Sequence, residues 1–132
     1  MAKIIILLKF IFHISILLLI TLSLYPGSLI GYLLYGDMGK QPNLIHNPFG
    51  TAINHFISYL YVSLLGLFVY LRNKNFKKLI FALFFLSAFL EILQLIVPNR
   101  SFQLVDLIGN ILGVIVAVTI IKVYLFLKNN ER

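Results

Sequence analysis

Four long apolar segments dominate the sequence and limit what the chain can fold into. They lie at residues 4–25, 53–71, 79–97 and 104–127, and each is close to the length of about 20 apolar residues that a helix needs to cross a bilayer. The chain is 61% hydrophobic and 11% charged, whereas about a quarter of the residues in a soluble domain are charged. The sequence therefore predicts an all-α, polytopic membrane protein with four transmembrane helices, formed by residues 1–132 as a single domain.

Two stretches of the chain have more than one interpretation. Residues 4–25 follow Lys3, as the apolar part of a signal peptide would, but the run lacks a small-residue cleavage site, which favours a retained helix. Within the first loop, residues 26–52, the apolar stretch 28–35 is too short to cross the membrane. This stretch either continues the first helix beyond a kink at Pro26 or lies at the interface, and residues 36–50 have the composition of an irregular loop.

The basic residues predict the orientation, because short cytoplasmic loops collect Lys and Arg. Most of them lie at the two chain ends and between the second and third segments, and the other two loops hold one each. The first group is Lys3, Lys9, Arg72, Lys74, Lys77, Lys78, Lys128 and Arg132, and the second is Lys40 and Arg100. We therefore expect both termini in the cytoplasm, with Asn43 and Asn99 outside.

Composition also excludes several functions. The chain has no cysteine, so it forms neither a disulfide nor a thiolate metal site. Its histidines, His13, His46 and His55, do not have the spacing of a zinc motif. The net charge of +7 would suggest nucleic acid in a soluble protein. Here no soluble domain presents a basic face, and we expect no nucleic-acid partner.

Polar residues inside the apolar segments mark a candidate site, because such residues are costly in a bilayer. Glu91 and Gln94 share a face near the end of the third segment, and Asp106 and Asn110 share a face at the start of the fourth. The tight turn between these segments brings the two pairs level with each other. His55 of the second segment lies at the same depth, so the polar side chains should converge near the extracytoplasmic face.

Two interpretations of this cluster remain open. It either binds a ligand or is a hydrogen-bonded network that holds the helices together. Two acids in a site of low dielectric constant need a compensating charge, which Arg100 above them could supply. Ser101 is a further candidate, as a binding residue or as the N-cap of the fourth helix. Gly109 and Gly113 predict close packing against a neighbouring helix.

The spacing of these residues resembles the signature of the VanZ-like family. Residues 91–113 contain an E-x-x-Q helix, a P-x-R-S turn and the pattern D-x-x-x-N-x-x-G, and residues 55–59 are similar to the family's H-F-x-x-Y. The core of the resemblance covers residues 51–117. It implies a bacterial membrane protein, in a family named after a member linked to resistance to teicoplanin, a glycopeptide that acts at the cell envelope.

The leading functional hypothesis is a multi-pass protein of the bacterial inner (cytoplasmic) membrane that binds a membrane lipid headgroup or a lipid-linked cell-wall precursor. The candidate binding residues are His55, Glu91, Gln94, Arg100, Ser101, Asp106 and Asn110. A rival hypothesis is an intramembrane hydrolase or transferase in which Glu91 or Asp106 acts as general base with His55, or in which these three residues hold a metal. A third is a structural partner subunit. The sequence leaves the cofactor and the oligomeric state open.

The orientation can be tested by cysteine labelling, because the natural chain has no cysteine. In intact cells an impermeant thiol reagent should label Asn99→Cys and leave Lys74→Cys unlabelled until the membrane is permeabilised. Labelling at position 74 but not at position 99 would reverse the orientation.

Overall fold

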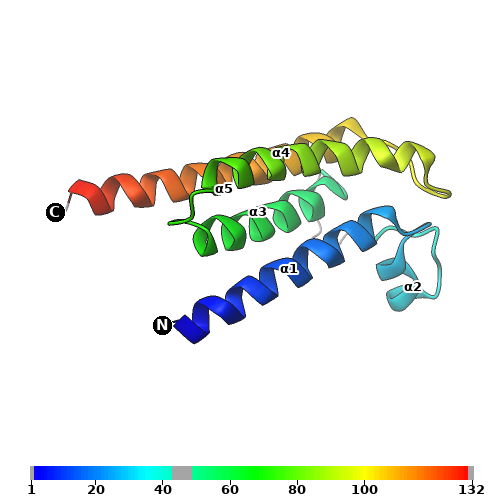
Figure 1. Cartoon of the computed structure of the whole chain (residues 1–132). Helices are drawn as coiled ribbons and strands as arrows, with labels where there is room; N and C mark the ends of the chain where they lie inside the picture. Colours follow the sequence, from blue (N-terminus) through cyan, green and yellow to red (C-terminus); the bar gives the residue numbers. More distant parts are fainter. Residues whose placement is uncertain (1, 43–48, 131–132) are drawn as a thin grey trace.

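The chain folds into helices joined by short loops, and the computed structural model describes residues 2–42 and 49–130 (Figure 1). The helices are α1 (Ala2–Leu24), α2 (Leu29–Tyr35), α3 (Ala52–Val69), α4 (Phe76–Leu93) and α5 (Leu104–Asn130), with a 3₁₀ turn, η1 (Gln94–Ile96), after α4. α1, α3, α5 and the unit of α4 and η1 are long and apolar enough to cross a membrane. The expected all-α fold with four such helices is confirmed. Asn43 and His46 lie outside the described residues.

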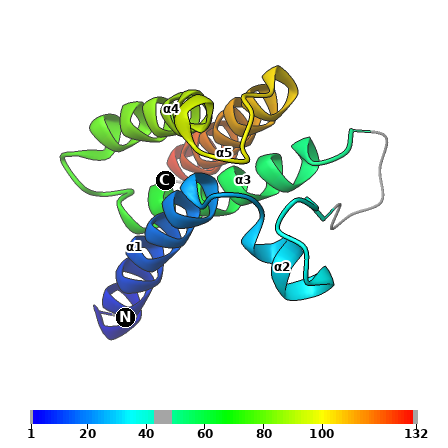
Figure 2. The same ribbon diagram turned by 90° about the vertical axis from the view of Figure 1, so that its right-hand side faces the viewer.

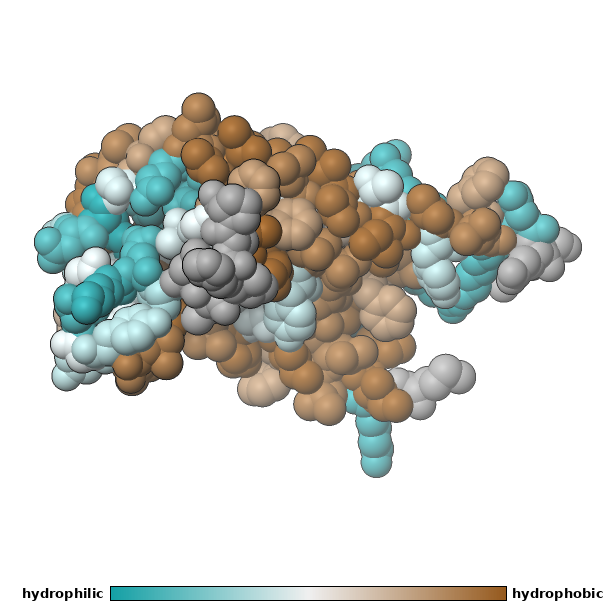
Figure 3. Space-filling model, turned by 180° about the vertical axis from the view of Figure 1, so that it is seen from behind, coloured by the Kyte–Doolittle hydropathy of each residue, from teal (hydrophilic) through white to brown (hydrophobic). Residues whose placement is uncertain are grey.

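The outer surface has the distribution of polarity that a bilayer requires. Figure 3 shows an apolar band over the middle of the molecule, with polar side chains gathered towards its two ends. Large apolar side chains such as Phe81, Phe85 and Ile115 are exposed on the helices. Soluble monomers rarely expose so continuous an apolar surface, whereas lipid chains cover it in a membrane.

α3 is the central helix of the bundle. Figure 2 shows α1 on one side of α3, and α4 and α5 on the other. The shared core consists of buried apolar side chains from these helices, among them Tyr59, Leu83, Val114 and Ala117. α3 and α5 make the most extensive contact, and both run in the same direction.

Two glycines allow α5 to approach α3 closely. A Cβ atom on Gly109 would lie 2.6 Å from the carbonyl oxygen of Ala52, and one on Gly113 would lie 2.6 Å from that of Phe56. No real Cβ tolerates such a distance, so only glycine fits at these positions without a shift of the helices. Because Gly109 and Gly113 contact residues of the first turns of α3, they also fix the register between the two helices.

α1 joins the bundle through a smaller contact. The ring of Phe12 is buried against Gly66 of α3, where a Cβ atom would lie 2.5 Å from the ring. The first turns of α1 are mostly exposed. The helix is therefore anchored near its middle and at its C-terminal end, and diverges from α4 towards its N-terminus (Figure 2).

The stretch after α1 forms a separate short helix rather than a continuation of α1. Gly27 turns the chain with φ of 80°, and the hydroxyl of Ser28 caps α2 by accepting a hydrogen bond of 2.9 Å from Gly31 N. α2 ends at Gly36, which has φ of 67°. Ser28 N also donates to Met38 O at 2.7 Å, so the chain returns towards its own start. The helix-extension interpretation is wrong because a capped turn intervenes, and the interfacial position of α2 stays a prediction.

Replacement of Gly113 should destabilise the bundle. Gly113→Leu forces α3 and α5 apart, and overpacking of this kind costs about 1–3 kcal/mol. Ile115→Leu, at an exposed position of the same helix, should change stability by less than about 0.5 kcal/mol. Thermal unfolding of the purified proteins in detergent compares the two variants, and equal midpoints would show that the glycine contact is unimportant.

Candidate functional site

Asn110 is the point at which three helices meet. Its Nδ2 donates to Ser87 O and to Glu91 Oε2 of α4, both at 3.3 Å. Its Oδ1 lies 3.0 Å from His55 Nδ1 of α3. Because the amide nitrogen donates to α4, the oxygen faces α3, and His55 Nδ1 must be the donor of that hydrogen bond. One fully buried side chain thus connects α3, α4 and α5.

The Glu91 carboxylate is fully buried but has partners for both oxygens. Oε2 accepts from Asn110, and Oε1 accepts a hydrogen bond of 3.1 Å from Gln103 N, directly before α5. The N-terminus of a helix carries a partial positive charge and free N–H groups. The start of α5 therefore provides part of the solvation that Glu91 loses by burial.

Asp106 lies in the first turn of α5 and faces α3. Its carboxylate accepts a hydrogen bond from Thr51 Oγ1 at 3.2 Å and forms an ion pair with His55, with 3.5 Å between Oδ2 and Nε2. Both ring nitrogens of His55 thus face oxygen atoms of side chains of α5.

Arg100 donates hydrogen bonds to carbonyls at the end of α1 rather than to a carboxylate. Nε donates to Tyr25 O at 3.1 Å and Nη2 donates to Leu22 O at 2.6 Å, so the guanidinium binds the last carbonyls of α1. Burial lowers the pKa of Arg100, and the carboxylates of Glu91 and Asp106 act in the opposite direction. The side chain stays charged, and it balances the acids from a distance, without a salt bridge to them within the described residues.

The turn before α5 explains how Arg100 reaches α1. Arg100 N donates to Val97 O at 3.2 Å, which closes a turn with Pro98 and Asn99 in its centre. Asn99 has φ of 58°, a conformation that asparagine adopts more readily than most residues. Ser101 is exposed in this segment, away from the cluster. α5 begins at Leu104, so Ser101 lies near the N-cap position of this helix but does not occupy it.

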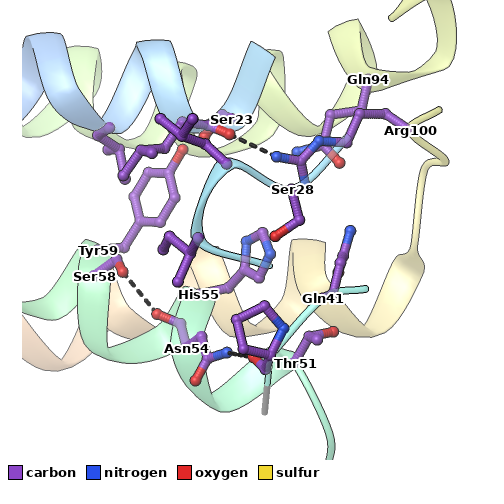
Figure 4. A pocket seen from close by; sticks show the side chains of 15 residues that line it. Ser23, Ser28, Gln41, Thr51, Asn54, His55, Ser58, Tyr59, Gln94 and Arg100 are labelled. Carbon is purple, nitrogen blue, oxygen red and sulfur yellow. Dashed lines mark hydrogen bonds between the residues drawn. The ribbon is translucent and has the colours of Figure 1, made fainter. Parts of the chain in front are cut away.

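A cavity of about 140 Å³ lies beside the cluster, between α1, the start of α2 and the first turns of α3 (Figure 4). Ten of its 15 lining residues are polar, which distinguishes it from a packing defect. His55 and Tyr59 form one wall, and Gln94 and Arg100 form another. Gln94, expected on the same α-helical face as Glu91, lies in the 3₁₀ turn and lines this cavity.

Three polar residues of this cavity were not predicted, although the sequence contains a signal for them. Thr51, Asn54 and Ser58 are spaced with His55 and Tyr59 at intervals that place all five on one helical face. Asn54 Nδ2 also donates to Pro42 O at 2.9 Å, which ties the first loop to α3. The loop residues Ser28 and Gln41 also line the cavity, and they carry no such periodicity.

The remaining predicted residues have clear positions. Gly109 and Gly113 lie at the interface with α3, as described above, and His13 Nδ1 lies 2.7 Å from Lys9 O, remote from the cluster. Within residues 2–42 and 49–130, no three His, Asp or Glu side chains are arranged to hold a metal ion. The metal site considered for Glu91, Asp106 and His55 is therefore not formed by this arrangement, in which Asn110 separates Glu91 from His55.

Comparison with known sequences gives one family. The model of the family described as VanZ/LLP1 matches residues 4–127, which extends beyond the core of residues 51–117 that carries the sequence signature. Neither the curated proteins nor the solved structures give a significant match.

Removal of the Asn110 amide should destabilise the bundle. Asn110→Leu leaves the facing atoms of His55 and Glu91 without partners, at about 1–3 kcal/mol for each buried polar group. Thr119→Val removes a polar group of α5 that bonds only to Ile115 O of its own helix, and should have little effect. The free energy of unfolding in mixed detergent measures both, and similar losses would show that Asn110 does not hold the helices together.

Proposed function

The chain belongs to the VanZ/LLP1 family, and we propose that it is a bacterial cytoplasmic-membrane protein whose cavity binds a phosphate-bearing lipid headgroup near the extracytoplasmic face. The observation that carries this proposal is a cavity lined largely by polar residues and bordered by a half-buried arginine, between helices that are otherwise apolar. Ionisable side chains such as His55 and Arg100 are costly in a membrane protein and mark functional sites by default.

Arg100 is the group best suited to an anionic ligand. Two of its five N–H groups donate to carbonyls of α1, so three point elsewhere and are available to a phosphate. Gln94 and the second N–H of the Asn54 amide add neutral donors along the walls, whereas the Ser58 hydroxyl donates to Asn54 O and can accept. The acids Glu91 and Asp106 are turned away into the network with Asn110 and His55, and do not repel an anion at short range.

The volume agrees with a headgroup rather than a whole lipid. About 140 Å³ accommodates roughly ten water molecules at 10–15 Å³ each, which is the scale of a phosphate with its neighbouring atoms. The acyl or prenyl part would remain in the surrounding bilayer. A link to teicoplanin susceptibility would follow if the bound headgroup belongs to the envelope material on which the antibiotic acts.

The second candidate function is intramembrane catalysis, which the pairing of His55 with Asp106 favours. His55 lines the cavity, and Asp106 and Asn110 orient its ring. Both ring nitrogens are already engaged by these partners, however, so neither points at a bound ligand. A general base must reach the proton that it removes, and the geometry therefore supports binding better than catalysis.

Filling the cavity should abolish headgroup binding without disturbing the bundle. Ser58→Leu places four carbon atoms at the cavity wall, and Ile57→Leu introduces the same residue at the exposed neighbouring position. Native mass spectrometry of the purified proteins would measure retention of a polyprenyl phosphate, of the polyprenol without phosphate, and of phosphatidylglycerol. We expect the wild type and Ile57→Leu to retain a phosphate-bearing lipid, and Ser58→Leu to lose it at least five-fold.

The comparison among lipids separates the possible sources. Preference for polyprenyl phosphate indicates a lipid-linked precursor, and preference for phosphatidylglycerol indicates a bulk lipid. Equal retention of the polyprenol, or equal retention by Ser58→Leu and Ile57→Leu, would contradict the proposal and leave the cluster as a structural network. Conversion of a lipid by the wild type but not by His55→Gln would favour the enzyme instead.

A further inference from the structure

A second cleft lies at the opposite end of the bundle, between α1 and the start of α4. Its volume is about 380 Å³. Asn75, Lys78, Leu79 and Ala82 line it from α4 and its N-cap, and their spacing places them on one face of the helix. This face changes from polar at the helix start to apolar about 9 Å further along, at 1.5 Å per residue.

The opposite wall combines polar and apolar side chains. Phe12 and His13 of α1 line the cleft, and Tyr70, after the end of α3, closes it. Lys9 Nζ lies 5.5 Å from the centre of the Tyr70 ring, which places a second cation beside the cleft. The two cations lie near the start of α4 and beside Tyr70, and apolar side chains follow further along α4. Such a cleft matches a molecule with an anionic head and an apolar chain.

No acid balances these cations in the described part of the chain. Arg72, Lys74 and Lys77 add to the positive charge between α3 and α4. The described acids Asp37, Glu91 and Asp106 all belong to the other end of the bundle, in the first loop or in the polar cluster. Among the described residues the charge at this end has no counter-ion, and basic clefts between transmembrane helices bind anionic headgroups.

We propose that this cleft is a binding site for an anionic phospholipid of the leaflet that faces the α3–α4 loop. The phosphate lies between Lys78 and Lys9, and an acyl chain runs along Leu79, Ala82 and Phe12. The α3–α4 loop and the first turn of α4 hold four basic residues, Arg72, Lys74, Lys77 and Lys78, and this charge favours the cytoplasmic leaflet. This site is separate from the cavity at Arg100 and does not depend on the function proposed for it.

The charge requirement can be tested with two neighbouring lysines. Lys78→Gln removes a cation that lines the cleft, and Lys77→Gln removes the same charge at an exposed position that does not line it. Native mass spectrometry of the full chain would measure retention of phosphatidylglycerol and of zwitterionic phosphatidylcholine. We expect the wild type to prefer phosphatidylglycerol, and Lys78→Gln to lose about five-fold of this preference, while Lys77→Gln keeps it.

The apolar part of the site has its own control. Ala82→Leu narrows the deeper cleft, and Ala88→Leu makes the same change on α4 outside the residues that line it. Ala82→Leu should weaken retention of phosphatidylglycerol, and Ala88→Leu should not. Three results would overturn the proposal. Equal losses with both lysine variants would show a diffuse basic surface, and equal retention of both lipids would show that no headgroup site exists. Equal effects of both alanine variants would show that no acyl groove exists.

Discussion

The close approach of α3 and α5 is the contact on which the polar site depends. Gly109 and Gly113 let the backbones meet where Ala52 and Phe56 present their carbonyls. His55 lies between these two residues of α3, and Asp106 and Asn110 flank Gly109 on α5. The distances of 3.0 Å and 3.5 Å from His55 to Asn110 and Asp106 exist because nothing larger than hydrogen separates the helices one residue away.

Because lipid chains offer no hydrogen-bond partners, the polar groups buried at this contact must bond to other groups of the protein. Glu91 obtains its hydrogen bonds from Asn110 and from the start of α5. Asp106 obtains its own from Thr51 and His55. Two acids can share this region because each has its own polar partners: His55 and Thr51 face one, and Asn110 and the start of a helix face the other. The cluster is therefore both a structural network and the wall of a cavity, and the two interpretations of the sequence do not exclude each other.

Periodicity and the turn at residues 98–101 made much of this arrangement predictable. An i, i+3 or i, i+4 spacing fixes which side chains share a helical face, and a tight turn fixes which turns of two helices are level. The position of His55 beside Asp106 and Asn110 followed from these two rules. Gln94 is buried like Glu91, at the start of a 3₁₀ turn that ends α4, and no residue type in the segment demands this tightening.

The partners of Arg100 and the cavity could not be predicted in the same way. Both depend on where the outer end of α1 lies, and α1 is positioned by the contact of Phe12 with Gly66 and by the path of the first loop. No periodic pattern connects residues 22–25 to residue 100. Likewise, the separation of α2 from α1 depended on a capping hydrogen bond of Ser28, which in sequence is one serine among several.

The two ends of the bundle differ in how their charges are balanced, and this difference constrains what each can bind. At the end that holds the polar cluster, Glu91 and Asp106 have partners in His55, an amide, a hydroxyl and a helix N-terminus. A ligand in the neighbouring cavity would therefore compete with water, and not with these acids, for the free donors of Arg100. At the other end Lys9 and Lys78 lack any acid among the described residues around them. An anion bound at that end would therefore be held mainly by charge, an attraction that salt screens, whereas a ligand in the cavity at Arg100 would depend more on shape and on hydrogen bonds.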